Sequence, residues 1–326
     1  MPLRFDVDQT IERLQEQIVG AVRDLGRRGA VVAISGGVDS SVCAALCAQA
    51  LGGAHVQGLL LPERASSPDA TRDGQDVADA LGIPVETVAI TDILAALGCY
   101  ELQEKAIRRV VPEFRASWPH KIVRSAPTGG MIVLSMEMHD EAGEVRTVRL
   151  PADVYRTYIA AQNMKQRVRK LVEYTWAERL GYAVIGTPNR LEYDQGFFVK
   201  SGDGLADIKP IAGLYKSQVF ALARALPLPE RIAVRAPTTD TFTLPQSQEE
   251  YFFGHPHERM DVLLWGRDND LPAPELAALA SLDEDLVTAA YSEIDRRRAG
   301  AHYLHAGAIV LEAHAGPGPE RFGAEV

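Results

Sequence analysis

Cysteine is scarce in this chain, with three residues among 326. Cys43 and Cys47 lie four apart in an apolar helical pattern, so we interpret them as small core residues rather than as a metal-binding or redox pair. The sequence also has no apolar run long enough to span a membrane and no apolar signal core near its N-terminus. This composition fits the reducing cytoplasm.

Basic residues are outnumbered, with 34 Lys and Arg against 44 Asp and Glu, which gives a formal net charge of −10. The chain has no basic stretch of the kind that binds a phosphate backbone, which argues against tRNA or DNA as the main partner. A small nucleotide held through Mg²⁺ stays compatible with an acidic protein.

Strand and helix patterns alternate along much of the chain. The apolar periodicity predicts helices at 8–27, 38–51, 69–82 and 152–181, and strands at 29–35, 56–62, 84–90 and 182–189. Such alternation predicts an α/β fold: a Rossmann-like, doubly wound parallel sheet covered by helices on both faces. Ligand sites in such sheets lie at the carboxyl ends of the strands.

Two helices carry finer signals. Ile11, Leu14, Ile18 and Leu25 are predicted to share one apolar face of the N-terminal helix. Ser281 and Glu284 have the spacing of a capping box, which predicts that the last helix begins after Ser281.

The stretch Ser35-Gly36-Gly37-Val38-Asp39-Ser40 joins an apolar strand directly to a helical pattern. Paired glycines at the start of a helix present closely spaced backbone N–H groups and the positive end of the helix dipole to an anion. The hydroxyl groups of Ser35, Ser40 and Ser41 are further donors. The loop contains no lysine and no third glycine at the required spacing, so neither a Walker A loop nor a Rossmann fingerprint fits. Asp39 repels a phosphate unless a cation lies between them, which predicts bound Mg²⁺.

This hexapeptide resembles the PP-loop of the ATP pyrophosphatases, which cleave ATP between its α- and β-phosphates and adenylate a substrate. A second stretch, residues 186–224, holds several charges in an otherwise apolar or Gly-rich segment, and such charges are destabilising unless they meet ligands. Its Gly-Thr…Glu…Gly-Phe-Phe-x-Lys-x-Gly-Asp-Gly…Asp…Tyr-Lys pattern is similar to that of the ammonia-dependent NAD synthetases. The resemblance covers about residues 8–98 and 160–240 and implies an adenine nucleotide α-hydrolase-like fold. We interpret Phe197 and Phe198 within the motif as core residues.

The resemblance implies an ATP-dependent amide ligase. Such an enzyme adenylates the nicotinate carboxylate of deamido-NAD with Mg-ATP, releases pyrophosphate, and forms NAD and AMP with ammonia. Asp39 and Glu192 match the Mg²⁺ ligands of that family. Asp203 and Lys216 match catalytic positions, Asp203 to bind ammonium and take its proton and Lys216 to stabilise charge on the phosphates. The matched ATP-binding residues are Ala33, Ser35, Gly36, Gly37, Asp39, Ser40, Thr187, Lys216 and Thr238. The matched substrate-binding residues are Arg167, Lys200, Asp203 and Asp207.

Three features depart from the family pattern. Residues 101–157 form a longer connection than usual, with a predicted β-hairpin at 131–151 that turns at 140–143 and follows a loop. This insertion either reshapes the substrate pocket or elaborates the surface for dimer packing. The segment Thr238-Thr239-Asp240-Thr241 replaces the usual flap sequence, which puts the contacts of the flap in doubt. The basic dipeptide that reaches the substrate in the family is not recognisable, and we assign that role to none of Arg296, Arg297, Arg298 and His302.

The chain is predicted to form a single domain over 1–326, with a short helical extension at about 270–326. The resemblance implies a homodimer that takes small-molecule substrates. Because no nitrilase-like glutaminase domain precedes the loop, we expect ammonia to be free or delivered by a separate glutaminase. Other functions stay open: the same chemistry on a different carboxylic acid in a specialised pathway, or a non-catalytic nucleotide sensor. Thiolation of tRNA or a small molecule would want a catalytic cysteine pair and a basic surface, and the sequence shows neither.

Overall fold

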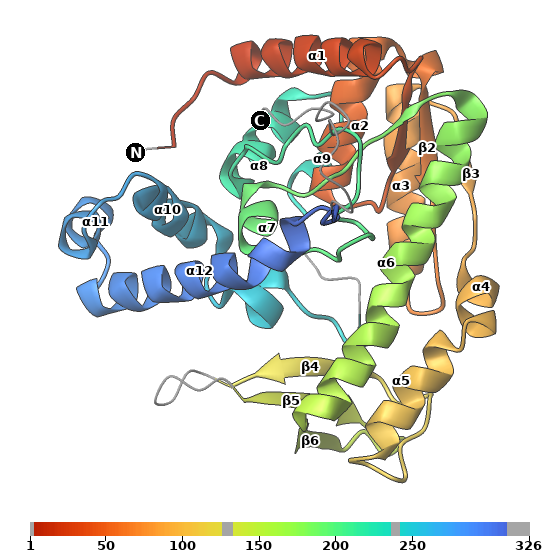
Figure 1. Cartoon of the computed structure of the whole chain (residues 1–326), viewed down its shortest axis with the longest axis vertical. Helices are drawn as coiled ribbons and strands as arrows, with labels where there is room; N and C mark the ends of the chain where they lie inside the picture. Colours follow the sequence, from red (N-terminus) through yellow and green to blue (C-terminus); the bar gives the residue numbers. More distant parts are fainter. Residues whose placement is uncertain (1–2, 126–132, 236–241, 312–326) are drawn as a thin grey trace.

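The computed structural model describes residues 3–125, 133–235 and 242–311, and its strands form two sheets (Figure 1). The first is a parallel sheet in the order β3-β2-β1-β7. Its strands are β1 (Ala30–Ala33), β2 (Val56–Leu60), β3 (Val85–Thr87) and β7 (Ala183–Val184). Each lies within a predicted range, so the predicted parallel α/β sheet is confirmed.

Helices cover both faces of this sheet. Ala30 and Val32 of β1 face one helix layer, whereas Val31 faces Ala177 of the long helix α6 (Ala152–Leu180) on the other side. Alternate residues of one strand are therefore buried against opposite layers, as a doubly wound sheet requires. The helices of the first layer are α1 (Val7–Asp24), α2 (Val38–Leu51), α3 (Pro68–Leu81) and α8 (Lys216–Ala225).

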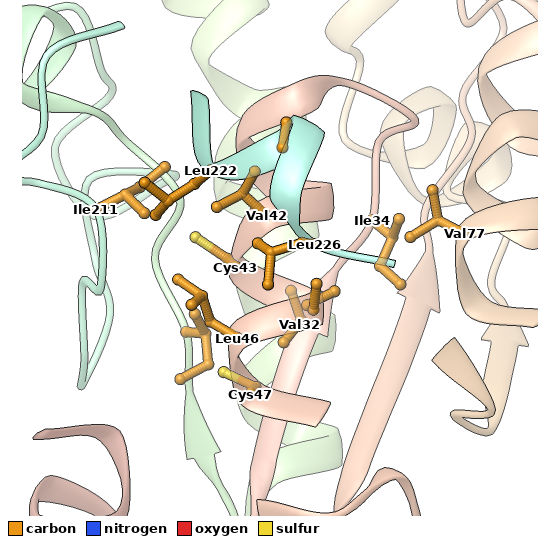
Figure 2. Packing of buried hydrophobic residues seen from close by; sticks show 14 of the residues in the cluster. Val32, Ile34, Val42, Cys43, Leu46, Cys47, Val77, Ile211, Leu222 and Leu226 are labelled. Carbon is orange, nitrogen blue, oxygen red and sulfur yellow. The ribbon is translucent and has the colours of Figure 1, made fainter. Parts of the chain in front are cut away.

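The core of the first layer is built around α2, as Figure 2 shows. Cys43 and Cys47 are fully buried among apolar side chains that include Val42, Leu46 and Leu222. Burial raises the pKa of the Cys47 thiol to about 12, so this thiol stays protonated at neutral pH. The interpretation of both cysteines as core residues is confirmed.

Helix α1 packs its apolar face on this core. Leu14 and Ile18 are buried, as predicted. Leu25 is 48% exposed, because the helix ends at Asp24 and Val22 occupies the buried position one turn beyond Ile18. The prediction is therefore wrong at Leu25.

An antiparallel sheet in the order β4-β5-β6 packs on the N-terminal half of α6, at the lower end of the molecule in Figure 1. Strands β5 and β6 confirm the predicted hairpin, which turns at Asp140. The prediction of loop before this hairpin is wrong, because β4 pairs with β5 along its length. Ile122 of β4 is fully buried with Met136 and Met138 of β5, close to Tyr158 of α6. The elements of this part are α4 (Thr91–Ala96), α5 (Cys99–Arg108), β4 (His120–Arg124), β5 (Leu134–His139) and β6 (Val145–Arg149).

The C-terminal helices pack on one another beside the parallel sheet (Figure 1). Helix α12 begins at Glu284, and its N-cap Asp283 accepts a hydrogen bond from the backbone N–H of Leu286 at 3.0 Å. The predicted capping box is wrong, because Ser281 ends α11 in a left-handed conformation with φ +54°. Within the described ranges, no helix combines the length and the hydropathy that crossing a membrane requires. The remaining elements are η1 (Gly53–His55), α7 (Arg190–Gln195), α9 (Glu230–Ala233), the π-helix η2 (Glu249–Phe253), α10 (His257–Asp268), α11 (Ala273–Ala280) and α12 (Glu284–His305).

Candidate active site

The loop between β1 and α2 forms one wall of the site. Gly36 has φ +77°, and a Cβ at this position would lie 2.7 Å from the carbonyl oxygen of Ala70. Only glycine fits this turn without strain. Gly37 is the N-cap of α2, and Asp39 lies in the first turn of that helix. The sequence thus places a carboxylate directly beside the N–H groups that open α2.

The serines of the loop differ in their orientation. The hydroxyl groups of Ser35 and Ser40 lie 3.1 Å apart, and both residues line a cavity. Ser41 is fully buried, and its hydroxyl donates to the carbonyl oxygen of Gly37 at 2.8 Å. The expectation that Ser41 adds a donor toward a bound anion is therefore wrong.

Asp39 lies at the centre of a polar cluster drawn from three helices. Its Oδ2 pairs with Nζ of Lys216, the first residue of α8, whose side chain is 2% exposed. Its Oδ1 accepts a hydrogen bond from Asn189 Nδ2 at 3.1 Å. The backbone N–H of Asn189 donates to Glu192 Oε2 at 3.1 Å, so Asn189 links the two carboxylates that we predict as magnesium ligands. Burial and then the negative charge of Asp39 raise the pKa of Glu192 to about 7.

A cavity of about 810 Å³ opens onto this cluster. Its described lining is positive although the chain is acidic, with eight basic side chains against five acidic ones. Gly36, a predicted ATP-binding residue, does not line the cavity, since it packs against Ala70. The predicted site residues that line the cavity are Ala33, Ser35, Gly37, Asp39, Ser40, Thr187, Glu192, Asp203 and Lys216.

A second polar group lies in the same lining around Asp203. Its Oδ1 accepts a hydrogen bond from the backbone N–H of Val199 at 2.7 Å, and burial raises the pKa of its carboxyl group. Lys170 Nζ and Glu173 Oε2 lie 2.6 Å apart, and each side chain is 5% exposed. Burial raises the pKa of Glu173, Lys170 lowers it, and the charge of Asp203 raises it to a smaller extent.

Three predicted substrate-binding residues lie outside this cavity. Among the described residues that line it, Arg167, Lys200 and Asp207 are missing. Arg167 Nε donates to the Lys200 carbonyl oxygen at 3.3 Å, and Lys200 Nζ donates to backbone carbonyls at the end of α12. The Asp207 carboxylate accepts a hydrogen bond from the Val184 N–H at 2.8 Å, which ties its loop to β7. Thr238 lies outside the described residues, so the roles of all four stay predictions.

The aromatic pair in the second motif is not a pair of core residues. Phe197 and Phe198 are partly buried, and both line the cavity. Phe197 packs against the cluster of C-terminal helices, whereas Phe198 stacks on Tyr193 with ring centroids 5.8 Å apart. The interpretation as core residues therefore holds in part for Phe197, which packs against a core cluster, and is wrong for Phe198, which belongs to none of the described apolar clusters.

Comparison with known proteins assigns this chain to a family. A family model described as NAD synthase matches residues 10–116 and 132–299. An NH(3)-dependent NAD(+) synthetase from Mesorhizobium japonicum is 48% identical over 305 residues, which cover 93% of this chain and 95% of that protein. The chain belongs to the NAD synthase family. The family that the two motifs resemble is thereby confirmed.

Solved structures agree on the fold of this NAD synthase family member. An NMN synthetase from Francisella tularensis superposes with a TM-score of 0.64 at 21% identity, covering 94% of this chain and 99% of that one. An NH3-dependent NAD synthetase from Campylobacter jejuni gives a TM-score of 0.62 at 21% identity, covering 94% and 100%. At this identity the likeness establishes the fold alone, and the predicted adenine nucleotide α-hydrolase-like fold is confirmed.

Two polar residues of the cavity region were not anticipated from the sequence. Asn189 lies three residues before Glu192, the spacing of an N-cap and its partner, and this was the available signal. Arg235 lines the cavity beside the loop, where Nη1 lies 3.4 Å from the carbonyl oxygen of Gly36 and pairs with Asp73. No local pattern marks Arg235, because its approach to the loop depends on the packing of α8 and α9.

Proposed function

We propose that this protein is an ammonia-dependent NAD synthetase that converts deamido-NAD, ATP and ammonia into NAD, AMP and pyrophosphate. The observation that carries the proposal is one cavity lined by Asp39, Glu192, Lys216 and Asp203, in a chain 48% identical to a protein of that name. Asp39, Glu192 and Lys216 suit the binding of Mg-ATP, and Asp203 suits proton transfer.

In the first step, a nicotinate carboxylate oxygen bonds to the α-phosphorus of ATP, and the bond from that phosphorus to the β-phosphate oxygen breaks. The loop at Gly37 offers backbone N–H groups to the pyrophosphate that leaves. Lys216 and Arg235 supply the positive charge that the loop lacks. Positive groups held in a partly buried cavity stabilise charge that develops on the phosphates as the bond breaks.

In the second step, ammonia attacks the carbonyl carbon of the acyl adenylate, and AMP leaves with the electron pair of the C–O bond. The nitrogen must lose protons, both to become neutral ammonia and to end as an amide. Asp203 is the proposed acceptor, since burial raises the pKa of its carboxyl group and makes it a better base. The nearby ion pair of Lys170 and Glu173 keeps this side of the cavity polar.

The residues around Asp39 fit a magnesium ion. Two carboxylates joined by Asn189 share one buried counter-ion, Lys216. Burial, followed by the negative charge of Asp39, raises the pKa of Glu192. Carboxylates with phosphate oxygens and water are the donors that Mg²⁺ prefers. Bound there, Mg²⁺ would neutralise phosphate charge, while Asp39 and Glu192 would hold it.

Removal of divalent metal is expected to lower NAD formation by at least about 100-fold, because the two carboxylates would then repel ATP. The measurement is the rate of NAD formation in excess EDTA and after titration with MgCl₂. The substitution Glu192→Gln, which removes the charge of one proposed ligand, should raise the Mg²⁺ concentration that gives the half-maximal rate. Full activity in excess chelator contradicts the magnesium site.

The proposed reaction is tested by incubating the purified protein with Mg-ATP, ammonium and deamido-NAD and measuring products by mass spectrometry. We expect NAD, AMP and pyrophosphate in equal amounts. AMP formed only with another carboxylic acid would favour the same chemistry in a specialised pathway. No ATP cleavage by a folded protein would favour a nucleotide sensor.

The proposed partners follow from this reaction. They are the small-molecule substrates, a second copy of the chain in a homodimer, and free ammonia or a separate glutaminase as the nitrogen source. We place the protein in the cytoplasm, where buried, unpaired thiols persist. The apparent mass in solution tests the homodimer. Arg167, Lys200 and Asp207 are proposed to bind deamido-NAD, and the KM for deamido-NAD of variants that remove each charge tests this role.

A further inference from the structure

Three arginines from two distant parts of the chain converge on one carboxylate in the cavity. Arg124 lies at the end of β4, whereas Arg296 and Arg297 lie on α12. Arg124 Nη2 lies 3.3 Å from Glu293 Oε1, and Arg297 Nη2 lies 3.0 Å from the same oxygen. Arg296 pairs with the other oxygen of Glu293. All four side chains line the cavity, and we call them the arginine cluster.

The arginine cluster is held in place by backbone carbonyls of the π-helix η2. Both Arg124 and Arg297 donate to the carbonyl oxygen of Phe252. Arg297 also donates to Gln195 Oε1 at 2.8 Å, and its guanidinium lies 4.8 Å from the centre of the Phe252 ring. These contacts fix the direction of the Arg124 and Arg297 guanidinium groups before any ligand binds. Such preorganised donors lose little freedom when they bind an anion.

The charges of the arginine cluster are not balanced within it. One carboxylate faces three guanidinium groups, of which Arg124 is 19%, Arg297 8% and Arg296 57% exposed. The pKa of Arg297 is lowered to about 10, chiefly by burial. The charge of Glu293 raises this pKa, whereas the charges of Arg124 and Arg296 lower it. A partly buried excess of positive charge is stabilised by an anion.

Strand β4, which carries Arg124, lies in a segment that the family model does not match. The family match omits residues 117–131, which contain β4 and Arg124, whereas Glu293, Arg296 and Arg297 lie inside the match. A segment outside the family match therefore contributes a guanidinium to a cavity that the matched residues build. This placement favours a role in ligand binding over simple surface elaboration.

We propose that the arginine cluster binds the pyrophosphate of the dinucleotide substrate, with Arg124 as a binding residue supplied by the antiparallel sheet. This inference rests on the proposed function, since it assumes a dinucleotide in the cavity. The occupant is the dinucleotide rather than ATP because the loop, Lys216 and Arg235 already provide an anion site on another wall. Planar guanidinium groups match phosphate oxygens in paired hydrogen bonds.

The test compares Arg124→Gln with the wild type in steady-state kinetics. The KM for deamido-NAD should rise about 10- to 100-fold, whereas the KM for ATP and kcat should change less than about threefold, because charge-assisted hydrogen bonds are lost only from the dinucleotide. Arg124→Lys should recover part of the loss. Arg146→Gln is the matched control, since Arg146 lies in the same sheet, pairs with Glu113 at the surface and does not line the cavity.

An unchanged KM for deamido-NAD in Arg124→Gln overturns the proposal, as does an equal rise in both KM values, which would indicate a structural role. Calorimetric binding of NAD without ATP gives a readout that does not need turnover, and the variant should bind NAD at least about tenfold more weakly. Wild type that binds NAD but forms none contradicts the proposed function and leaves the binding comparison decisive. Wild type that neither binds nor forms NAD contradicts both.

Discussion

Replacement of Lys216 by methionine is expected to lower kcat/KM for ATP by about 10³-fold, the upper range for removal of one preorganised electrostatic group. Lys216 lines the cavity, its side chain is 2% exposed, and its ammonium group is paired with Asp39. Methionine keeps the length and the apolar stem of the side chain but removes the charge. The variant would therefore lack stabilisation of the leaving pyrophosphate and leave the carboxylates of Asp39 and Glu192 in excess.

The measurement is AMP formation at several ATP concentrations, together with the midpoint of thermal unfolding. Lys105→Met is the control, because Lys105 forms an exposed ion pair with Glu101 on α5 and does not line the cavity. The Lys216 variant is expected to fold, since its backbone N–H still bonds to Asp261 Oδ1 at 3.1 Å. Wild-type kcat/KM in a folded Lys216→Met protein would exclude the proposed role.

Asp203→Asn is expected to separate the two steps of the reaction. Asparagine can still accept the hydrogen bond from the Val199 N–H, but it does not take a proton. NAD formation should fall about 10²- to 10³-fold, the usual contribution of a positioned base. Exchange of labelled pyrophosphate into ATP in the presence of deamido-NAD should continue near the wild-type rate, because adenylation does not use this group.

The pH dependence gives a second readout for Asp203. Raising the pH increases the fraction of neutral ammonia, so the deficit of Asp203→Asn relative to wild type should shrink as the pH rises. A variant that only disturbed the fold would not improve in this way. Amination at the wild-type rate at pH 7, or parallel loss of both pyrophosphate exchange and NAD formation, would contradict the role of Asp203 in proton transfer.

Local sequence patterns correctly predicted the turn around Gly36 and the parallel sheet. The strand, the two glycines and the helix around Gly36 form a contiguous anion loop, because the backbone conformation of a turn is set by the residues in it. The alternation of strands and helices predicted the parallel sheet for the same reason. Local signals failed where two elements compete: Ser281 has the chemistry of an N-cap, yet it ends α11, and Asp283 caps α12 instead.

By itself, the sequence determined the fold class and the family, and it named nine of the residues that line the cavity, because hydrophobic periodicity and motif spacing are local properties of the chain. Only the tertiary structure decided which charges meet. Lys216 reaches Asp39 across 177 residues, and Arg124 reaches Glu293 across 169. It also placed Arg167, Lys200 and Asp207 outside the cavity that the other predicted site residues line. The physical reason is that an ion pair depends on distance in space, which is set by how the sheets and α6 pack.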